Sequence, residues 1–536
     1  LDQYYVDIVS RFYPAIYTPD LLLNQPNGDK RPILFVEYSH SMGNSTGNMK
    51  EFWDIFRSRP RLIGGCIWDF KDQGIAKKDS TGKEFYAYGG DFGDKPNDGN
   101  FCINGIADAS GRPKAAMYEC KRVYQPAETQ WKDQQQGIIS IENRHAAKNL
   151  SAYAIYLNFL QNGALIKSIQ IPSQDIPAGS TKALNISAYY PALKSGSEYL
   201  LNISFKLKED ELWATKGYEI AANQLEIKPL VKGIQLSPGA ALSVAPGGGF
   251  TSLKGKDFQI TFKNGALSSY ISNGYEFIKE PFLPHFTRPQ TDNDRRGWKP
   301  NKKLKTWYEA KPTLKSFKTI KEGAVYQSVY EIVKDSAEVQ LTYTISHDGG
   351  IKVDYALKAN QAMPNIPKVG LQGGIANPLQ QITFYGKGPH ENYIDKAFGA
   401  DAGIYTAALK DFTEPYIYPQ ENANRTGIRW MSFSDAKNNL MVVADSLLSM
   451  SAWPYTEKNI IEAKHTYKLK DPGFITLNID LIQMGIGGND TWSDVSQPLP
   501  QYQIKSGNYN YSFYLKPGPA ADLNTQLRQY QKLKIK

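Results

Sequence analysis

The stretch that most constrains the fold is residues 32–45, where a short apolar run leads into Glu37 and then into a polar loop. Such a run, bounded by turn-forming residues, is typical of a buried β-strand. Residues 49–57 follow with apolar side chains at helical spacing, and Pro60 ends that pattern. A second short apolar run over residues 62–69 completes the order strand, helix, strand.

This order predicts two parallel strands joined by a right-handed crossover. Parallel neighbours end on the same edge of a sheet, so we expect Glu37 and Trp68 to lie together at that edge. A carboxylate beside an indole suits sugar chemistry, because the carboxylate attacks an anomeric carbon while the indole packs against ring C–H groups. A carboxylate that caps the helix or joins an ion pair fits the same pattern, and the pattern alone favours that structural alternative.

Composition limits the class of protein. The chain has 536 residues, of which 41% are hydrophobic, so it is expected to form about three domains with substantial cores. Its net charge of +9 raises the question of nucleic acid, but the excess Lys is spread along the chain. The most basic stretch, residues 295–305, is better explained as a solvated loop than as a phosphate-binding patch. We expect neither nucleic acid nor a membrane as partner, since no apolar run approaches the length of a membrane span.

Cysteine and histidine usage argues against two further classes. The three cysteines, Cys66, Cys102 and Cys120, are too few and too irregularly spaced for a disulfide framework. Six His without a recognisable ligand motif argue against a transition-metal site.

The sequence pattern changes near residue 127, from strand and helix to alternating strands. Strands are expected at 137–142, 153–160, 164–171 and 198–207, and Asn162-Gly163 is a strong hairpin signal. These features predict an immunoglobulin-like β-sandwich over 127–228 that acts as a spacer.

Pro and Gly are dense over residues 229–249, which predicts a linker. Beyond it, residues 258–262, 339–346 and 351–357 alternate again, with turns at Asn264-Gly265 and Asn273-Gly274. Residues 250–536 are therefore expected to form one large antiparallel β-domain.

Seven blocks in the chain resemble, in the same order, the large β-galactosidases of glycoside hydrolase family 2. They are EYSHSMGNS (37–45), GGCIWDF (64–70), YGGDFGD (88–94), FCING (101–105), FTR with DND (286–288 and 292–294), GPHENY (388–393) and MGIGGNDTWS (484–493). Together they span nearly the whole chain. The departures are small, such as Ser39 and Ser41 where many relatives carry Ala.

The resemblance implies a multidomain fold of the α/β plus all-β class. Residues 1–126 correspond to the C-terminal part of a (β/α)8 barrel, 127–228 to the immunoglobulin-like sandwich and 250–536 to a large antiparallel β-supersandwich. In the family, the proton-donating Glu, the Mg²⁺ ligands and two leading β-domains precede this segment. We therefore expect this chain to be the C-terminal portion of a larger enzyme, to lack the Mg²⁺ ligands and to be inactive alone.

The resemblance also implies roles for individual residues. Glu37 matches the nucleophile, Tyr13 a hydrogen-bonding partner of the nucleophile, His40 a ligand of galactose hydroxyls, Trp68 the floor under galactose and Trp492 the outer sugar platform. Asn104 and the carbonyl of Phe101 match part of a Na⁺ site that contacts the sugar, and the Asp that completes that site is expected outside this chain. Tyr13, His40 and Trp68 each have an alternative role in plain packing.

The sequence thus predicts a retaining β-galactosidase that hydrolyses terminal non-reducing β-D-galactosides, and a homo-oligomer for the full-length enzyme. Two alternatives remain. One is a non-catalytic carbohydrate-binding or assembly module, and the other is a family 2 glycosidase of different sugar specificity.

Overall fold

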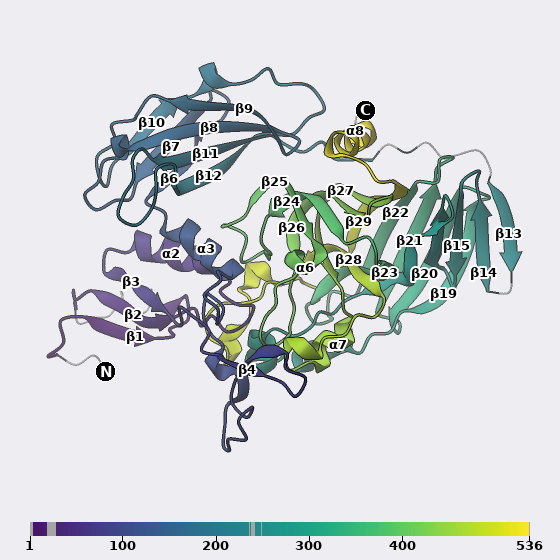
Figure 1. Ribbon diagram of the computed structural model, residues 1–536, viewed down its shortest axis with the longest axis horizontal. Helices are drawn as coiled ribbons and strands as arrows, with labels where there is room; N and C mark the ends of the chain where they lie inside the picture. The colour runs from purple at the N-terminus through teal and green to yellow at the C-terminus, as the bar shows by residue number, and fades with distance from the viewer. Residues whose placement is uncertain (1–3, 19–27, 235, 237–241, 248, 535–536) are drawn as a thin grey trace.

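The computed structural model describes residues 4–18, 28–234, 236, 242–247 and 249–534, which form three regions packed against one another (Figure 1). In this part of the chain, no helix is long and apolar enough to cross a membrane.

The first region is built on a three-stranded parallel sheet. Its strands lie in the order β1 (Val9–Phe12), β2 (Ile33–Tyr38) and β3 (Leu62–Ile67), and α2 (Met49–Ser58) and α3 (Ala115–Tyr124) pack on it. The predicted strand, helix and parallel strand are confirmed. A hairpin of β4 (Ile75–Lys78) and β5 (Glu84–Ala87) and the short helix η1 (Gly99–Cys102) follow β3 and were not predicted.

The helix α2 forms because its apolar side chains fall on one face. Met49, Phe52 and Phe56 are buried, and the Phe56 ring lies 5.1 Å from that of Phe35 on β2. Burial of each such side chain contributes about 1.5–3 kcal/mol. The helix ends at Arg59, whose extended backbone suits the residue before Pro60.

The second region is a sandwich of two antiparallel sheets around one apolar core (Figure 1). One sheet has the order β10 (Thr181–Asn185), β7 (Ile138–Asn143), β6 (Ala127–Asp133), and the other has the order β12 (Glu219–Lys228), β11 (Tyr199–Leu207), β8 (Tyr153–Gln161), β9 (Ala164–Ile171). Short helices η2 (Leu150–Ala152) and η3 (Ser187–Tyr189) connect strands. Asn162 and Gly163 have φ values of 49° and 83°, as the predicted tight hairpin turn requires.

The third region contains a five-stranded and a twelve-stranded sheet that share one core. The smaller sheet runs in sequence order through β13 (Ser243–Gly247), β14 (Phe250–Lys254), β15 (Phe258–Lys263), β16 (Ala266–Ser272) and β17 (Tyr275–Glu276). The larger sheet comprises β18 (Ile278–His285), β19 (Thr313–Lys321), β20 (Val325–Val333), β21 (Ala337–Ile345), β22 (Ile351–Ala359), β23 (Lys368–Ala376), β24 (Gln381–Gly388), β25 (Asp401–Ala408), β26 (Arg425–Ser434), β27 (Asn438–Trp453), β28 (Phe474–Gln483) and β29 (Tyr509–Pro519). All pairings in both sheets are antiparallel, as predicted.

Short helices lie between these strands or after them. They are η4 (Asn293–Trp298), α4 (Pro300–Lys303), α5 (Lys305–Tyr308), α6 (Leu409–Phe412), α7 (Glu457–Glu462), η5 (Thr466–Lys468), η6 (Asp494–Ser496), η7 (Pro500–Tyr502) and the C-terminal α8 (Leu523–Lys534).

The end of the predicted linker differs from expectation. Ser243–Gly247 forms β13 and pairs with β14, because the antiparallel partner supplies the hydrogen bonds that a linker would lack. Residues 235, 237–241 and 248 of the predicted linker lie outside the described part of the chain.

The three regions also contact one another through buried polar groups. Glu198 of the sandwich accepts hydrogen bonds from Tyr385 and Arg429 of the third region. The backbone N–H of Gly399 donates to Glu119 of α3 at 2.7 Å. An apolar cluster that includes Leu160 and Tyr530 joins the sandwich to the third region. These contacts join both the first region and the sandwich to the third region.

Candidate active site

The carboxyl ends of β1, β2 and β3 bring the first sequence-predicted residues together. Phe12 pairs with Glu37, and the N–H of Tyr13 donates to the carbonyl of Glu37 at 2.9 Å. Trp68 follows β3 directly, and its carbonyl accepts from the N–H of Ser41 at 2.8 Å. Glu37 and Trp68 therefore belong to the ends of adjacent parallel strands, as the sequence pattern predicted.

Glu37 is half-buried, and among the described residues it forms no ion pair. The Tyr13 side chain is buried beside it. Burial and the neighbouring Glu37 carboxylate together raise the pKa of Tyr13 far above its ordinary value of 10.0. Tyr13 is thus a neutral hydroxyl that can donate a proton in a hydrogen bond to the Glu37 carboxylate.

His40 lies in the loop after β2 and is almost completely buried. Its Nδ1 is 2.7 Å from the hydroxyl oxygen of Thr491, which in turn donates to Asn293 Oδ1 at 2.9 Å. Because the Thr491 proton is used on Asn293, His40 carries its own proton on Nδ1 and Nε2 is left as an acceptor. Burial lowers the pKa of His40 to about 4, despite the nearby Asp292 carboxylate, so the ring is neutral at physiological pH.

Trp492 reaches this site from the third region. Its ring contacts those of Tyr13 and His40 edge-on, with centroids 4.8 Å and 5.2 Å apart, and Phe101 stacks on His40 at 5.3 Å. We call these four residues the aromatic cluster. Trp492 is 43% exposed, so a free ring surface remains for a ligand.

Trp68 stands apart from the aromatic cluster. It is 41% exposed and makes no ring contact with any residue that the structure describes. Its predicted place as a floor under the sugar stays a prediction.

The loop that carries Trp492 is held by a buried network that the sequence analysis did not assign. Arg288 donates to both carboxylate oxygens of Asp294 and to the carbonyls of Met484 and Gly485, at 2.8–3.2 Å. Asp395 accepts from the N–H groups of the next two loop residues at 3.0 Å and 2.8 Å. Arg288 and Asp294 lie in the paired block at 286–288 and 292–294 that resembles the family. That resemblance was the available sequence signal for their structural role.

The loop after Glu37 is tied to the third region as well. Asn44 donates to the carbonyl of Glu421 at 2.8 Å and accepts from Lys396 Nζ at 2.7 Å. Its backbone N–H donates to Gln420 Oε1 at 3.0 Å. Three residues of the third region thus hold the loop that follows Glu37 in place.

Asn104 and Phe101 meet as predicted. Asn104 Nδ2 donates to the carbonyl of Phe101 at 3.0 Å, while Asn104 Oδ1 is buried without a hydrogen-bond partner. The carbonyl of Asn104 accepts from the N–H of Asp69 at 2.7 Å. An unpartnered buried oxygen beside a carbonyl is compatible with a hard cation such as Na⁺. The described residues contain no group of three or more His, Cys, Asp or Glu side chains suited to a metal.

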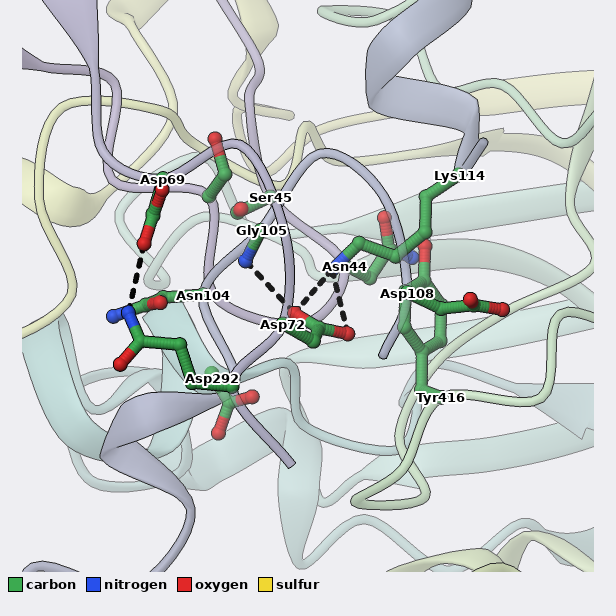
Figure 2. Close-up of polar contacts among 12 residues, drawn as sticks. Asn44, Ser45, Asp69, Asp72, Asn104, Gly105, Asp108, Lys114, Asp292 and Tyr416 are labelled. Carbon is green, nitrogen blue, oxygen red and sulfur yellow. Dashed lines mark hydrogen bonds and ion pairs between the residues drawn. The ribbon is translucent and has the colours of Figure 1, made fainter. Parts of the chain in front are cut away.

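A buried ion pair supports the loop that bears Asn104 (Figure 2). Lys114 Nζ lies 3.1 Å from Asp72 Oδ1, which also accepts from the N–H of Gly105 at 2.7 Å. Burial raises the pKa of Asp72, and Lys114 opposes that shift. The lysine and aspartate are 42 positions apart and carry no sequence signal that they pair.

The other carboxylates near Tyr13 are already engaged. Asp69 accepts from the N–H of Phe70 and from Gln73 Nε2, and Asp490 accepts from Ser493 through both its N–H and its hydroxyl. Of these three carboxylates, Glu37 is the one positioned at a strand end without a fixed partner, so it is the candidate nucleophile.

Comparisons with known proteins bear on the whole chain. Residues 1–129 match the model described as glycosyl hydrolases family 2, TIM barrel domain; residues 139–228 match β-galactosidase, domain 4; and residues 254–515 match β-galactosidase small chain. The order of these models confirms the predicted fold class.

Two curated relatives are both β-galactosidases. The protein of Priestia megaterium is 33% identical over 527 residues, covering 95% of this chain and 50% of the relative. That of Halalkalibacterium halodurans is 32% identical over 502 residues, covering 91% of this chain and 48% of the relative. The chain therefore spans about half the length of the curated relatives it matches. Among solved structures, galactose 1-epimerase from Lactobacillus acidophilus matches 53% of this chain and 100% of its own, with 8% identity and a TM-score of 0.33.

Successive family models along the chain and relatives at about one-third identity agree with the motifs found in the sequence. The chain belongs to glycoside hydrolase family 2.

Proposed function

We propose that this chain carries the nucleophile side of the active site of a retaining β-galactosidase acting on terminal non-reducing β-D-galactosides. The observation that carries this proposal is the Glu37 carboxylate at the end of β2, beside the buried hydroxyl of Tyr13 and the aromatic cluster. The β-galactosidase names of the relatives support the choice of sugar.

In the proposed reaction, a Glu37 oxygen bonds to the anomeric carbon while the bond to the leaving oxygen breaks. Tyr13 donates a hydrogen bond to the carboxylate and keeps it oriented. Nε2 of neutral His40 accepts a hydrogen bond from a sugar hydroxyl, and the exposed ring of Trp492 packs against the sugar C–H groups.

A retaining glycosidase also needs a carboxylic acid about 5 to 5.5 Å from the nucleophile to protonate the leaving oxygen. Asp69 and Asp490 are held by hydrogen bonds of their own and are poorly suited to that role. We therefore expect this chain alone to turn over an unactivated aryl β-galactoside no faster than its Glu37→Gln variant.

The nucleophile is tested with a substrate that needs no acid. In dinitrophenyl 2-deoxy-2-fluoro-β-galactoside the leaving group departs unprotonated, and the fluorine slows hydrolysis of the glycosyl-enzyme. We expect intact-mass spectrometry to show one added fluorogalactosyl group, and peptide mapping to place it on Glu37. Tyr13→Phe should slow labelling by about tenfold, which corresponds to the loss of one hydrogen bond to a charged group.

The matched control for labelling is Glu51→Gln. Glu51 lies on α2, and its carboxylate accepts a hydrogen bond from the Tyr502 hydroxyl. That variant should label like the unaltered chain. Labelling that persists in Glu37→Gln would refute the nucleophile assignment. No labelling, together with lactose binding that depends on Trp492, would favour a carbohydrate-binding module.

Trp492→Ala should weaken lactose binding by about tenfold, because stacking on an aromatic ring contributes about 0.5–1.5 kcal/mol. Isothermal calorimetry measures this. Trp213→Ala is the matched control, since Trp213 is 64% exposed on the sandwich and packs on Tyr218. Equal losses in both variants would contradict the platform role.

We further propose that Asn104 Oδ1 and the carbonyl of Phe101 bind Na⁺, with other ligands supplied from elsewhere. The unpartnered Asn104 oxygen supports this. Lactose affinity should then be higher in NaCl than in choline chloride at equal ionic strength, and Asn104→Ala should remove the difference. An unchanged difference in that variant would contradict the site.

A further inference from the structure

A cleft of about 760 Å³ lies next to the aromatic cluster, and nothing in the proposed reaction uses it. It runs between the loop over residues 88–100 of the first region and residues 459–470 of the third, with Arg295 and Arg296 of η4 on its wall. Its volume falls within the range of about 300–1,000 Å³ that is usual for sites that bind organic ligands.

Phe101 connects this cleft to the candidate active site. Gly99 and Asn100 line the cleft and belong to the same short helix as Phe101. The Phe101 ring stacks on His40, and the guanidinium of Arg296 lies 5.4 Å from the centre of that ring. The cleft is therefore linked to His40 of the candidate active site through the Phe101 ring.

The cleft is rich in cations that lack an acidic partner. Its basic lining residues are Arg295, Arg296, Lys464, Lys468 and Lys470, and its acidic ones are Asp91 and Glu462. Both acidic side chains already have partners of their own. Asp91 lies 3.0 Å from His465 Nε2, and Glu462 pairs with Lys458 at 3.7 Å.

Of the five cations, Arg295 pairs with the Asp292 carboxylate. Within the described ranges, Arg296 and the three lysines form no ion pair.

Arg296 has unused hydrogen-bonding capacity. Its Nη2 donates to the carbonyl of Asp98 at 2.8 Å and to Asn100 Oδ1 at 3.0 Å, while its Nε is buried without a partner. Burial and the adjacent Arg295 lower the pKa of Arg296. A bound anion would reduce the repulsion between the two guanidinium groups.

The same cleft offers stacked rings. Tyr88 stacks on His465 with centroids 4.5 Å apart, and Tyr467 stacks on the same imidazole at 5.4 Å. All three residues line the cleft. Rings beside unpaired cations fit a pyranose that bears an acidic group better than they fit either a neutral sugar or a bare inorganic anion.

We propose that this cleft is a subsite for an acidic sugar, bearing a carboxylate or a sulfate ester, on the leaving-group side of the bond that Glu37 attacks. Its place on the leaving side rests on the proposed function above. The acidic-sugar site itself rests on the four unpaired cations and the ring stack.

The test is a ligand-observed NMR titration of the whole chain with matched sugars. Glucuronate and glucose differ at one carbon, and glucose 6-sulfate separates a sulfate ester from a carboxylate. We expect at least one acidic sugar to bind about tenfold more tightly than glucose at low salt, consistent with one charge-assisted hydrogen bond. Raising the salt concentration should reduce this preference.

Two variants test the named residues. Arg296→Gln should abolish the preference, and Lys468→Gln, at an exposed position on the rim, should weaken it without any risk to the core. Lys302→Gln is the control, since Lys302 is exposed on α4 outside the cleft. Equal binding of acidic and neutral sugars, or a preference unchanged in both Arg296→Gln and Lys468→Gln, would overturn the proposal.

Two further results separate this proposal from the proposed function. Inorganic sulfate that competes as strongly as the acidic sugars would overturn recognition of a sugar. If the preference is present but fluorogalactoside labelling of Glu37 fails, the leaving-side assignment is overturned. If labelling succeeds and the preference is absent, the subsite alone is wrong.

Discussion

Arg288→Met is expected to lower the free energy of unfolding by about 3–5 kcal/mol, because it leaves the buried Asp294 carboxylate without its cation. Both side chains are completely buried. Burial disfavours the charged guanidinium, but Asp294 outweighs that effect and the pKa of Arg288 is raised. The variant also loses the donors to the carbonyls of Met484 and Gly485, which hold the Trp492 loop.

Urea denaturation followed by tryptophan fluorescence measures this loss. Lys303→Met is the matched control. Lys303 pairs at 2.7 Å with Asp494, which follows Trp492 in the chain, and both side chains are exposed. An exposed pair of this kind contributes about 0–1 kcal/mol. Arg288→Met with a loss no larger than that of Lys303→Met would show that the buried pair does not anchor the loop.

Glu421→Gln is expected to make the protein less sensitive to alkaline pH. Glu421 is fully buried, and one of its carboxylate oxygens has no hydrogen-bond partner. Burial raises the pKa of Glu421 from 4.5 to about 8, although Arg288, Lys368 and a hydrogen bond from Gln483 oppose the shift. The folded state therefore keeps a proton that the unfolded state has released.

The direction of the pH effect follows from this difference. Because the folded pKa is the higher one, the stabilisation is fully present below pH 4.5 and is lost as the pH rises toward 8. Between pH 6 and pH 8 the unaltered protein should lose about 2 kcal/mol through this one group. The Gln variant lacks that slope, so its stability relative to the unaltered protein should rise over the same interval.

Thermal or urea unfolding at several pH values detects the change in slope. Glu322→Gln is the control, since Glu322 is exposed in the turn after β19. Asp480 is also buried with a pKa raised to about 7, but it titrates in both proteins and its contribution cancels. Parallel stability curves for Glu421→Gln and the unaltered protein would contradict the prediction.

Much of the local structure was predictable from sequence, because it depends on neighbouring residues. The helix after β2 was expected at 49–57 and lies at Met49–Ser58. The helical spacing of Met49, Phe52 and Phe56 in the sequence gives its buried face. The Asn-Gly turns at 162, 264 and 273 all have the positive φ values that two-residue hairpins require. The parallel strands alone were enough to expect Glu37 and Trp68 at one edge.

Less local features escaped the sequence analysis. The strand Ser243–Gly247 lies in a stretch rich in Pro and Gly and forms because β14 pairs with it. The Asp72 to Lys114 ion pair joins residues with no periodic relation. In each case the partner is supplied by a distant part of the chain, and local patterns carry no information about it.

By itself, the sequence determined many of the elements and the candidate site residues, because strand period, helix spacing and turn residues act within a few positions. Tertiary structure alone decided that the Trp492 and Tyr13 ring centroids lie 4.8 Å apart. It also decided that Thr491 contacts His40 Nδ1 and so determines which ring nitrogen carries the proton. These contacts join residues more than 450 positions apart, and only the packing of the third region against the sheet edge brings them together.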